Sequence, residues 1–159
     1  MTCRSPSHVG AVPAPQRGLA VPSADSYTEA MTVLIGYLPA PEGEAALELG
    51  FAEAKLRGTR AVVVNSPRKG AVDSVTTIQQ EDTARIVELG AADGVEVEVV
   101  QPTHEDDLVG TLNDLAKLHE AQIIVIGLRK RSAIGKFILG SQAQRILLDA
   151  AVPVLTAKA

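Results

Sequence analysis

The sequence predicts an α/β fold: a doubly wound five-stranded parallel sheet with helices on both faces, Rossmann-like, in the strand order 3-2-1-4-5. From residue 32 onward, short apolar runs typical of strands alternate with longer segments of helical period. Each segment between two runs is long enough for a right-handed helical crossover. One run, QIIVIG at residues 122–127, is apolar on both faces, which indicates a strand buried between two helical layers.

Five strands and four helices are expected in alternation. The expected strands are residues 32–37, 60–65, 95–100, 122–127 and 152–157. The expected helices are residues 42–57, 75–93, 105–120 and a fourth that starts near Gly140. The expected buried faces are, for the first helix, Ala45, Leu49, Ala52 and Leu56, and for the fourth, Ala143, Ile146, Leu147 and Ala150. In the third strand Glu96 and Glu98 share one face, which places that strand at a sheet edge.

Composition places the chain among small globular domains and argues against several classes of function. The 159 residues suffice for one domain with its own core. The formal net charge of -4 argues against a nucleic-acid partner, because such binders are usually basic. Since Cys3 is the only cysteine, no disulfide or cysteine-based zinc site can form within the chain, which suits a cytoplasmic protein. No apolar run approaches the ~18 residues of a membrane span, so no membrane partner is expected.

Residues 1–30 differ from the rest of the sequence. They are rich in Pro, Ser, Gly and Ala and show no apolar period, which is typical of a disordered segment. They lack the continuous apolar stretch of a signal peptide. Two interpretations stay open: a disordered N-terminal extension, or a mis-assigned start with translation beginning at Met31. In both, the folded domain is residues 31–159.

The segment with the clearest chemical pattern is GLRKRSAIGKFILGS at residues 127–141. Gly127 and Gly140 allow the backbone to approach an anion closely, and Ser141 opens a helix whose N-terminus carries partial positive charge. The segment also holds four cations in a net acidic chain, Arg129, Lys130, Arg131 and Lys136. These features favour a phosphate-binding loop. The alternative is structural: Ser141 caps the helix, and Gln144 completes a capping box with it.

The same segment resembles the nucleotide loop of the universal stress protein family, whose pattern is G-x2-G-x9-G-[ST]. Gly127 matches the first glycine, and Gly140 with Ser141 matches the final pair. The likeness extends from Met31 to Lys158, and it implies a cytoplasmic stress-response domain whose loop faces phosphate. With the loop cations and the next helical residue included, the candidate phosphate-binding residues are Gly127, Arg129, Lys130, Gly140, Ser141 and Gln142.

Two departures from the family pattern affect the expected ligand. Lys130 stands where the pattern has its middle glycine. Leu38, Pro39 and Ala40 replace the Asp-Gly-Ser of nucleotide-binding relatives, so these positions offer no carboxylate to the ribose hydroxyls. The loss of such a hydrogen-bond partner costs roughly 1–3 kcal/mol. The resemblance therefore implies weak binding of ATP, another adenine nucleotide or another phosphate-bearing ligand, with magnesium only if ATP binds.

Three functional hypotheses follow. The leading one is a stress-response and signalling module with a phosphate-facing loop. The second is an ATP-binding member of the family with slow ATP hydrolysis. The third is a ligand-free structural dimer partner, in which Ser141 is only a helix cap. In each, the resemblance implies a homodimer that pairs through the last strand, whose edge is free to recruit a partner. The sequence offers no convincing catalytic acid, base or nucleophile, so at most a weak ATPase is expected.

Several polar residues give weaker signals. Glu105, Asp106 and Asp107 favour a charged first turn of the third helix over a metal site, and no metal ligand is expected. His104 and His119 are expected at the surface. Residues 68 and 69, Arg and Lys, lie in the loop after the second strand and either add positive charge to the phosphate site or only flank that loop.

Overall fold

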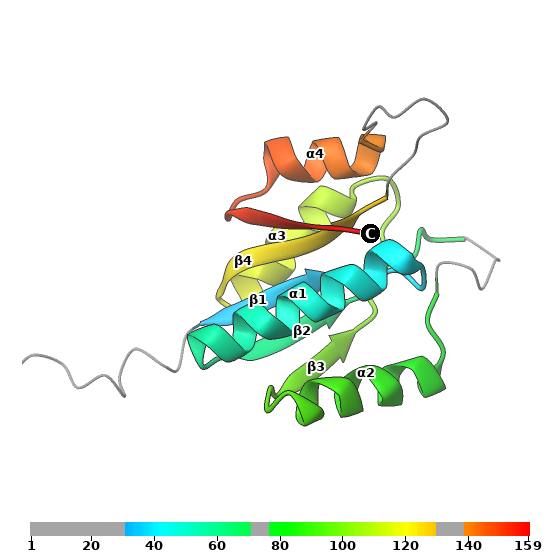
Figure 1. Ribbon diagram of the computed structural model, residues 1–159. Helices are drawn as coiled ribbons and strands as arrows, with labels where there is room; N and C mark the ends of the chain where they lie inside the picture. Colours follow the sequence, from blue (N-terminus) through cyan, green and yellow to red (C-terminus); the bar gives the residue numbers. More distant parts are fainter. Residues whose placement is uncertain (1–30, 71–76, 130–138) are drawn as a thin grey trace, which may run out of the picture.

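A computed structural model describes residues 31–70, 77–129 and 139–159 of the chain (Figure 1). Five parallel strands form one sheet in the order β3-β2-β1-β4-β5, which confirms the predicted fold class and strand order. The strands are β1 (Thr32–Gly36), β2 (Arg60–Val64), β3 (Val97–Val100), β4 (Ala121–Leu128) and β5 (Val154–Lys158). The helices are α1 (Pro41–Arg57), α2 (Gln80–Ala92), α3 (Leu108–Leu118) and α4 (Ser141–Asp149).

Two helical layers enclose the sheet, one on each face (Figure 1). On one face, α1 and α2 pack through residues such as Phe51 and Ile86 against alternate side chains of β1, β2 and β4. On the other face, α3 and α4 pack through Leu112 and Ile146. Successive side chains of β1 point to opposite faces of the sheet, as in any strand. Val33 therefore packs in one layer and Leu34 in the other. The interior strand β4 is buried on both faces, as its sequence predicts.

The predicted buried face of α1 is wrong. The side of α1 that meets the sheet consists of Gly43, Ala46, Leu47, Gly50, Phe51 and Ala54. Leu56 is 81% exposed, and Leu49 is only half-buried. The physical reason is close packing: a Cβ on Gly50 would overlap the Ile35 side chain, so small residues let the helix approach the sheet. A pattern search that follows large apolar side chains misses such a face.

Several predicted boundaries also differ from the structure. Residues 77–79 are not helical, and α2 begins at Gln80. The acidic triplet precedes α3 instead of forming its first turn, because Asp107 is the N-cap and its carboxylate accepts a hydrogen bond from the Gly110 N–H at 2.9 Å. In α4 only Ile146 is fully buried, while Leu147 and Leu148 are exposed. The edge position predicted for the third strand is confirmed. Within the described ranges, no helix combines the length and apolarity of a membrane span.

Candidate anion-binding crevice

The carboxyl ends of β1 and β4 lie side by side at the centre of the sheet. The strands that follow β1 in the chain, β2 and β3, lie on one side of it in the sheet. β4 lies on the other side of β1, and β5 lies beyond β4. Such a switch point is where doubly wound sheets bind their ligands, because the two following loops diverge there. A cavity of about 230 Å³ opens at this point, between the starts of α1, α3 and α4. The fold therefore places a crevice where the sequence predicts a phosphate site.

The structure brings four of the six predicted site residues to this crevice. Gly127 and Arg129 come from the end of β4, and Gly140 and Gln142 come from the start of α4. Ser141 is exposed at the first position of α4 and does not line the cavity. Lys130 lies outside the described residues, as do the other loop cations Arg131 and Lys136.

The two motif glycines have different structural reasons for being glycine. A Cβ on Gly127 would lie 1.7 Å from the carbonyl oxygen of Glu42, so glycine is required for the first turn of α1 to pack against β4. A Cβ on Gly140 would meet no atom within 4 Å among the described residues. The backbone angles of Gly140, φ −63° and ψ 152°, also suit any amino acid. Packing therefore accounts for Gly127 and leaves Gly140 open toward the crevice.

Among the described residues, no side chain caps the N-terminus of α4. Gly140 is the N-cap residue, and Ser141 already belongs to the helix, so the predicted capping box is not formed. The Gln144 side chain instead donates to the carbonyl oxygen of Leu139 at 3.1 Å. The first N–H groups of a helix have no intrahelical partner, and their partial positive charge favours an anion. At α4 they lie beside Gly140 and Gln142, at one end of the crevice.

The opposite wall comes from the loop between β1 and α1. Leu38 lines the crevice and is 43% exposed, so an apolar side chain stands at this wall. The loop is tight: the Ala40 N–H donates to the Leu38 carbonyl oxygen at 2.8 Å, and a Cβ on Gly43 would overlap that same carbonyl. Glu42, from the first turn of α1, also lines the crevice. Alignment to the family motif misses this residue because it lies beyond the three replaced positions.

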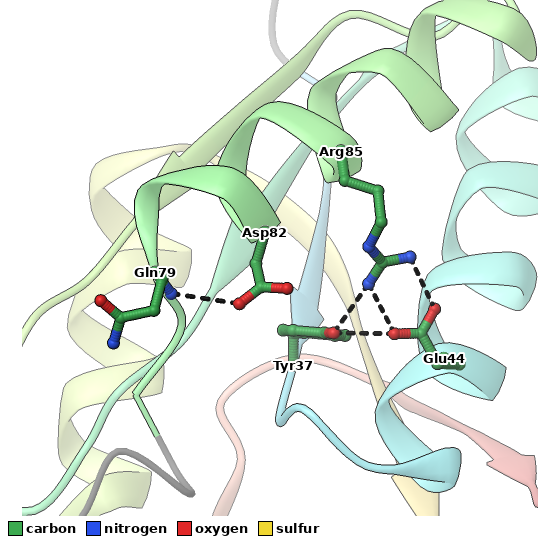
Figure 2. Close-up of polar contacts among 5 residues, drawn as sticks. All are labelled: Tyr37, Glu44, Gln79, Asp82 and Arg85. Atoms are coloured by element: carbon green, nitrogen blue, oxygen red, sulfur yellow. Dashed lines mark hydrogen bonds and ion pairs between the residues drawn. The ribbon is translucent and has the colours of Figure 1, made fainter.

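A polar cluster in the layer of α1 and α2 joins these two helices to Tyr37, the residue after β1 (Figure 2). The buried Tyr37 hydroxyl donates to Glu44 Oε1 at 2.7 Å and accepts from Arg85 Nη2 at 3.0 Å. Arg85 also holds the Glu44 carboxylate with both terminal nitrogens, at 2.7 and 3.1 Å. Burial, with the hydrogen bond to Glu44, raises the pKa of Tyr37 to about 12. The hydrogen bonds from Arg85 lower the pKa of the Glu44 carboxyl.

This cluster positions the first loop, since Tyr37 lines the crevice and immediately precedes Leu38. Figure 2 also shows the start of α2, where the Asp82 carboxylate accepts from the Gln79 N–H at 3.2 Å. Asn65 adds a buried support: its amide donates to the Tyr37 carbonyl oxygen at 3.1 Å and accepts from the Ile78 N–H. No sequence signal finds this arrangement, because Glu44 and Arg85 lie 41 positions apart.

The cations of the loop after β2 do not join the crevice. Arg68 pairs with the Asp106 carboxylate, and Lys69 with that of Glu105 at 3.1 Å. These exposed pairs tie the loop after β2 to the loop after β3, which accounts for part of the acidic triplet. Ser66, which lines the crevice, hydrogen-bonds to His104 Nδ1 at 3.0 Å. Among the described residues, no group of three His, Cys, Asp or Glu side chains is arranged to hold a metal ion.

Comparison with known proteins agrees with this architecture. Residues 30–158 match the model of the universal stress protein family. The chain belongs to the universal stress protein family. A universal stress protein of Mycolicibacterium smegmatis is 34% identical over 126 residues, which cover 79% of this chain and 96% of that protein. The solved structure of a universal stress protein from Archaeoglobus fulgidus superposes with a TM-score of 0.69 and 31% identity, over 80% of this chain and 98% of that one.

A second structure from Archaeoglobus fulgidus contains a ligand. It is a universal stress protein in complex with dAMP, with a TM-score of 0.63 and 25% identity. The similarity covers 82% of this chain and all of that chain. Adenine-nucleotide binding is therefore a property found among the relatives of this chain.

Proposed function

We propose that this protein is a stress-response or signalling module whose crevice binds a phosphate-bearing small molecule with modest affinity. One observation carries the proposal: Arg129, Gly140 and the N-terminus of α4, which no described side chain caps, meet on one cavity at the switch point of the sheet. Hydrogen bonds to charged groups each contribute about 1.5–3 kcal/mol, so a few such donors suffice for weak anion binding.

The crevice offers fewer contacts to the nucleoside half of ATP than to its phosphates. Leu38 offers no hydrogen-bond acceptor to a ribose, and Pro39 offers no N–H. The dAMP-bound relative shows that a family member can hold a nucleotide without a 2′-hydroxyl, so an adenine nucleotide remains a candidate ligand. We therefore propose binding of AMP-like ligands at the phosphate end, in preference to tight ATP binding. Slow ATP hydrolysis, the second hypothesis, requires another hydrogen-bond acceptor for the ribose hydroxyls. The Glu42 carboxylate is the candidate, because Glu42 lines the crevice.

We also propose that two copies of the chain pair through β5. This strand is the last in the sheet order. The Pro153 carbonyl accepts from Ile124, and the Ala159 N–H donates to Leu128, so these residues face β4. The alternation along a strand then turns the backbone groups of Thr156 away from β4, toward a partner. Edge strands with such groups readily recruit another strand.

Calorimetry on the full chain tests the binding proposal. ATP with and without magnesium, AMP and sulfate are titrated into the wild type, Arg129→Glu and Arg57→Glu. Arg57 is the matched control, since it lies at the far end of α1 and pairs with Glu53. We expect weak binding of the phosphate compounds, a loss of about 10-fold or more with Arg129→Glu, and no change with Arg57→Glu. Equal affinities in wild type and Arg129→Glu would refute the site, and no binding of any anion would favour a ligand-free dimer partner.

A further inference from the structure

The inner end of the crevice is lined by apolar side chains. They come from the layer between the sheet and the pair α3 and α4, where Val64, Leu112, Ile126 and Ile146 belong to the core. The partly buried Leu108 and Ala143 complete this wall. The cavity therefore extends from the N-terminus of α4 toward the hydrophobic core beneath α3 and α4. An aliphatic group placed there leaves water and gains contacts with the core.

The polar side chains next to the inner wall already have partners within the protein. Tyr37 belongs to the opposite layer under α1 and α2, where its hydroxyl is bound to Glu44 and Arg85. The Ser66 hydroxyl is bound to His104. Leu38 is the side chain of the first loop that faces the crevice. A nucleobase or sugar at this end would have to compete for these hydrogen bonds or leave its own polar groups without partners, which costs about 1–3 kcal/mol per group.

The outer end has the opposite character. Arg129 is exposed there, and Gly140 and Gln142 lie at the N-terminus of α4. From these two ends we infer that the crevice selects phosphate monoesters of an aliphatic chain, with the phosphate at α4 and the chain beneath α3 and α4. This inference rests on the anion site proposed above, and it adds the chemical class of the group attached to the phosphate.

A homologous ligand series tests the inference on the full chain. Inorganic phosphate, ethyl, butyl and hexyl phosphate, AMP and hexanol are titrated by calorimetry below the concentrations at which the alkyl phosphates aggregate. Burial of each added methylene is expected to tighten binding up to about fourfold. Hexyl phosphate should therefore bind at least 10-fold more tightly than ethyl phosphate and more tightly than AMP.

Two variants separate the apolar end from the anion end. Ala143→Leu fills the inner wall and keeps Arg129 and Gly140, so inorganic phosphate should bind as in wild type while the dependence on chain length disappears. Ala92→Leu, at the exposed last residue of α2, is the matched control and should retain the dependence.

The outcomes distinguish this inference from the function on which it rests. If inorganic phosphate and AMP bind but the chain adds no affinity, or if AMP binds more tightly than hexyl phosphate, the aliphatic class is wrong and the anion site stands. If hexanol binds as tightly as hexyl phosphate and no phosphate compound competes with it, the anion site is wrong. If nothing binds, both are wrong.

Discussion

Replacement of Gly127 by alanine places a methyl group where the backbone of α1 already lies. The new Cβ would be 1.7 Å from the Glu42 carbonyl oxygen and 2.4 Å from its carbon. Both atoms belong to backbone, so no side chain can rotate away, and the first turn of α1 must move from β4. Overpacking of a core typically costs about 1–3 kcal/mol, and the backbone contact places Gly127→Ala near 3 kcal/mol. At about 2–4 °C per kcal/mol for a chain of this size, Tm should fall by about 6–12 °C.

Gly140→Ala is the matched control for this prediction. Its methyl group meets no described atom within 4 Å, and its backbone angles suit alanine. Alanine lowers the conformational entropy of the unfolded chain, which stabilises the variant. Alanine is also a poorer N-cap residue than glycine, which destabilises it. Because the two effects oppose each other, the free energy of unfolding should stay within about 1 kcal/mol of wild type. Urea unfolding of the full chain measures both variants. An unchanged stability of Gly127→Ala, or an equal loss in both variants, would refute the separation of the two glycines into a packing residue and a ligand-facing residue.

Two further predictions concern the polar cluster and the last strand. In the full chain with Tyr27→Phe, Tyr37 is the only tyrosine, and its near-ultraviolet titration should give a pKa of about 12. Because burial and the Glu44 hydrogen bond raise this pKa above the unfolded value of about 10, the folded state holds the phenol proton more tightly, and between pH 10 and 12 the free energy of unfolding should fall by about 2–3 kcal/mol more in wild type than in Tyr37→Phe. A titration near pH 10 would contradict it. Thr156→Pro should convert a dimer to a folded monomer, because proline removes a donor that faces away from β4. Sedimentation of the wild type as a monomer at high concentration would contradict pairing through β5.

The sequence predicts most of the fold because the period of its apolar residues is clear. The alternation of runs yields the order of elements, and the apolar run of β4 identifies it as an interior strand of the sheet. The buried face of α1 does not follow from the spacing of large apolar residues. Gly43 and Gly50 lie on that face and pack closely because they lack a side chain, so they add nothing to the apolar pattern. The start of α4 is shifted by one residue from the predicted cap, since Gly140 and not Ser141 is the N-cap.

The site is only partly predictable for a different reason. Motif spacing identifies Gly127 and Gly140 as neighbours of one crevice, but it does not reveal that Gly127 is also required by the carbonyl of Glu42. The support of the first loop by Glu44 and Arg85 depends on the relative placement of α1 and α2, which local patterns do not encode. The functional conclusion therefore needs the assembled sheet, where distant segments meet.

The central claim is that the crevice between β4 and α4 binds an anion. An amide-resolved NMR titration of the full chain with AMP tests it most directly. The account predicts saturable shifts at Gly127, Arg129 and residues 140–142, all with one dissociation constant, and none at the opposite end of the sheet near Gly58 and Gly94. Shifts confined to other surfaces, or no saturable shift at residues 140–142, would contradict the claim.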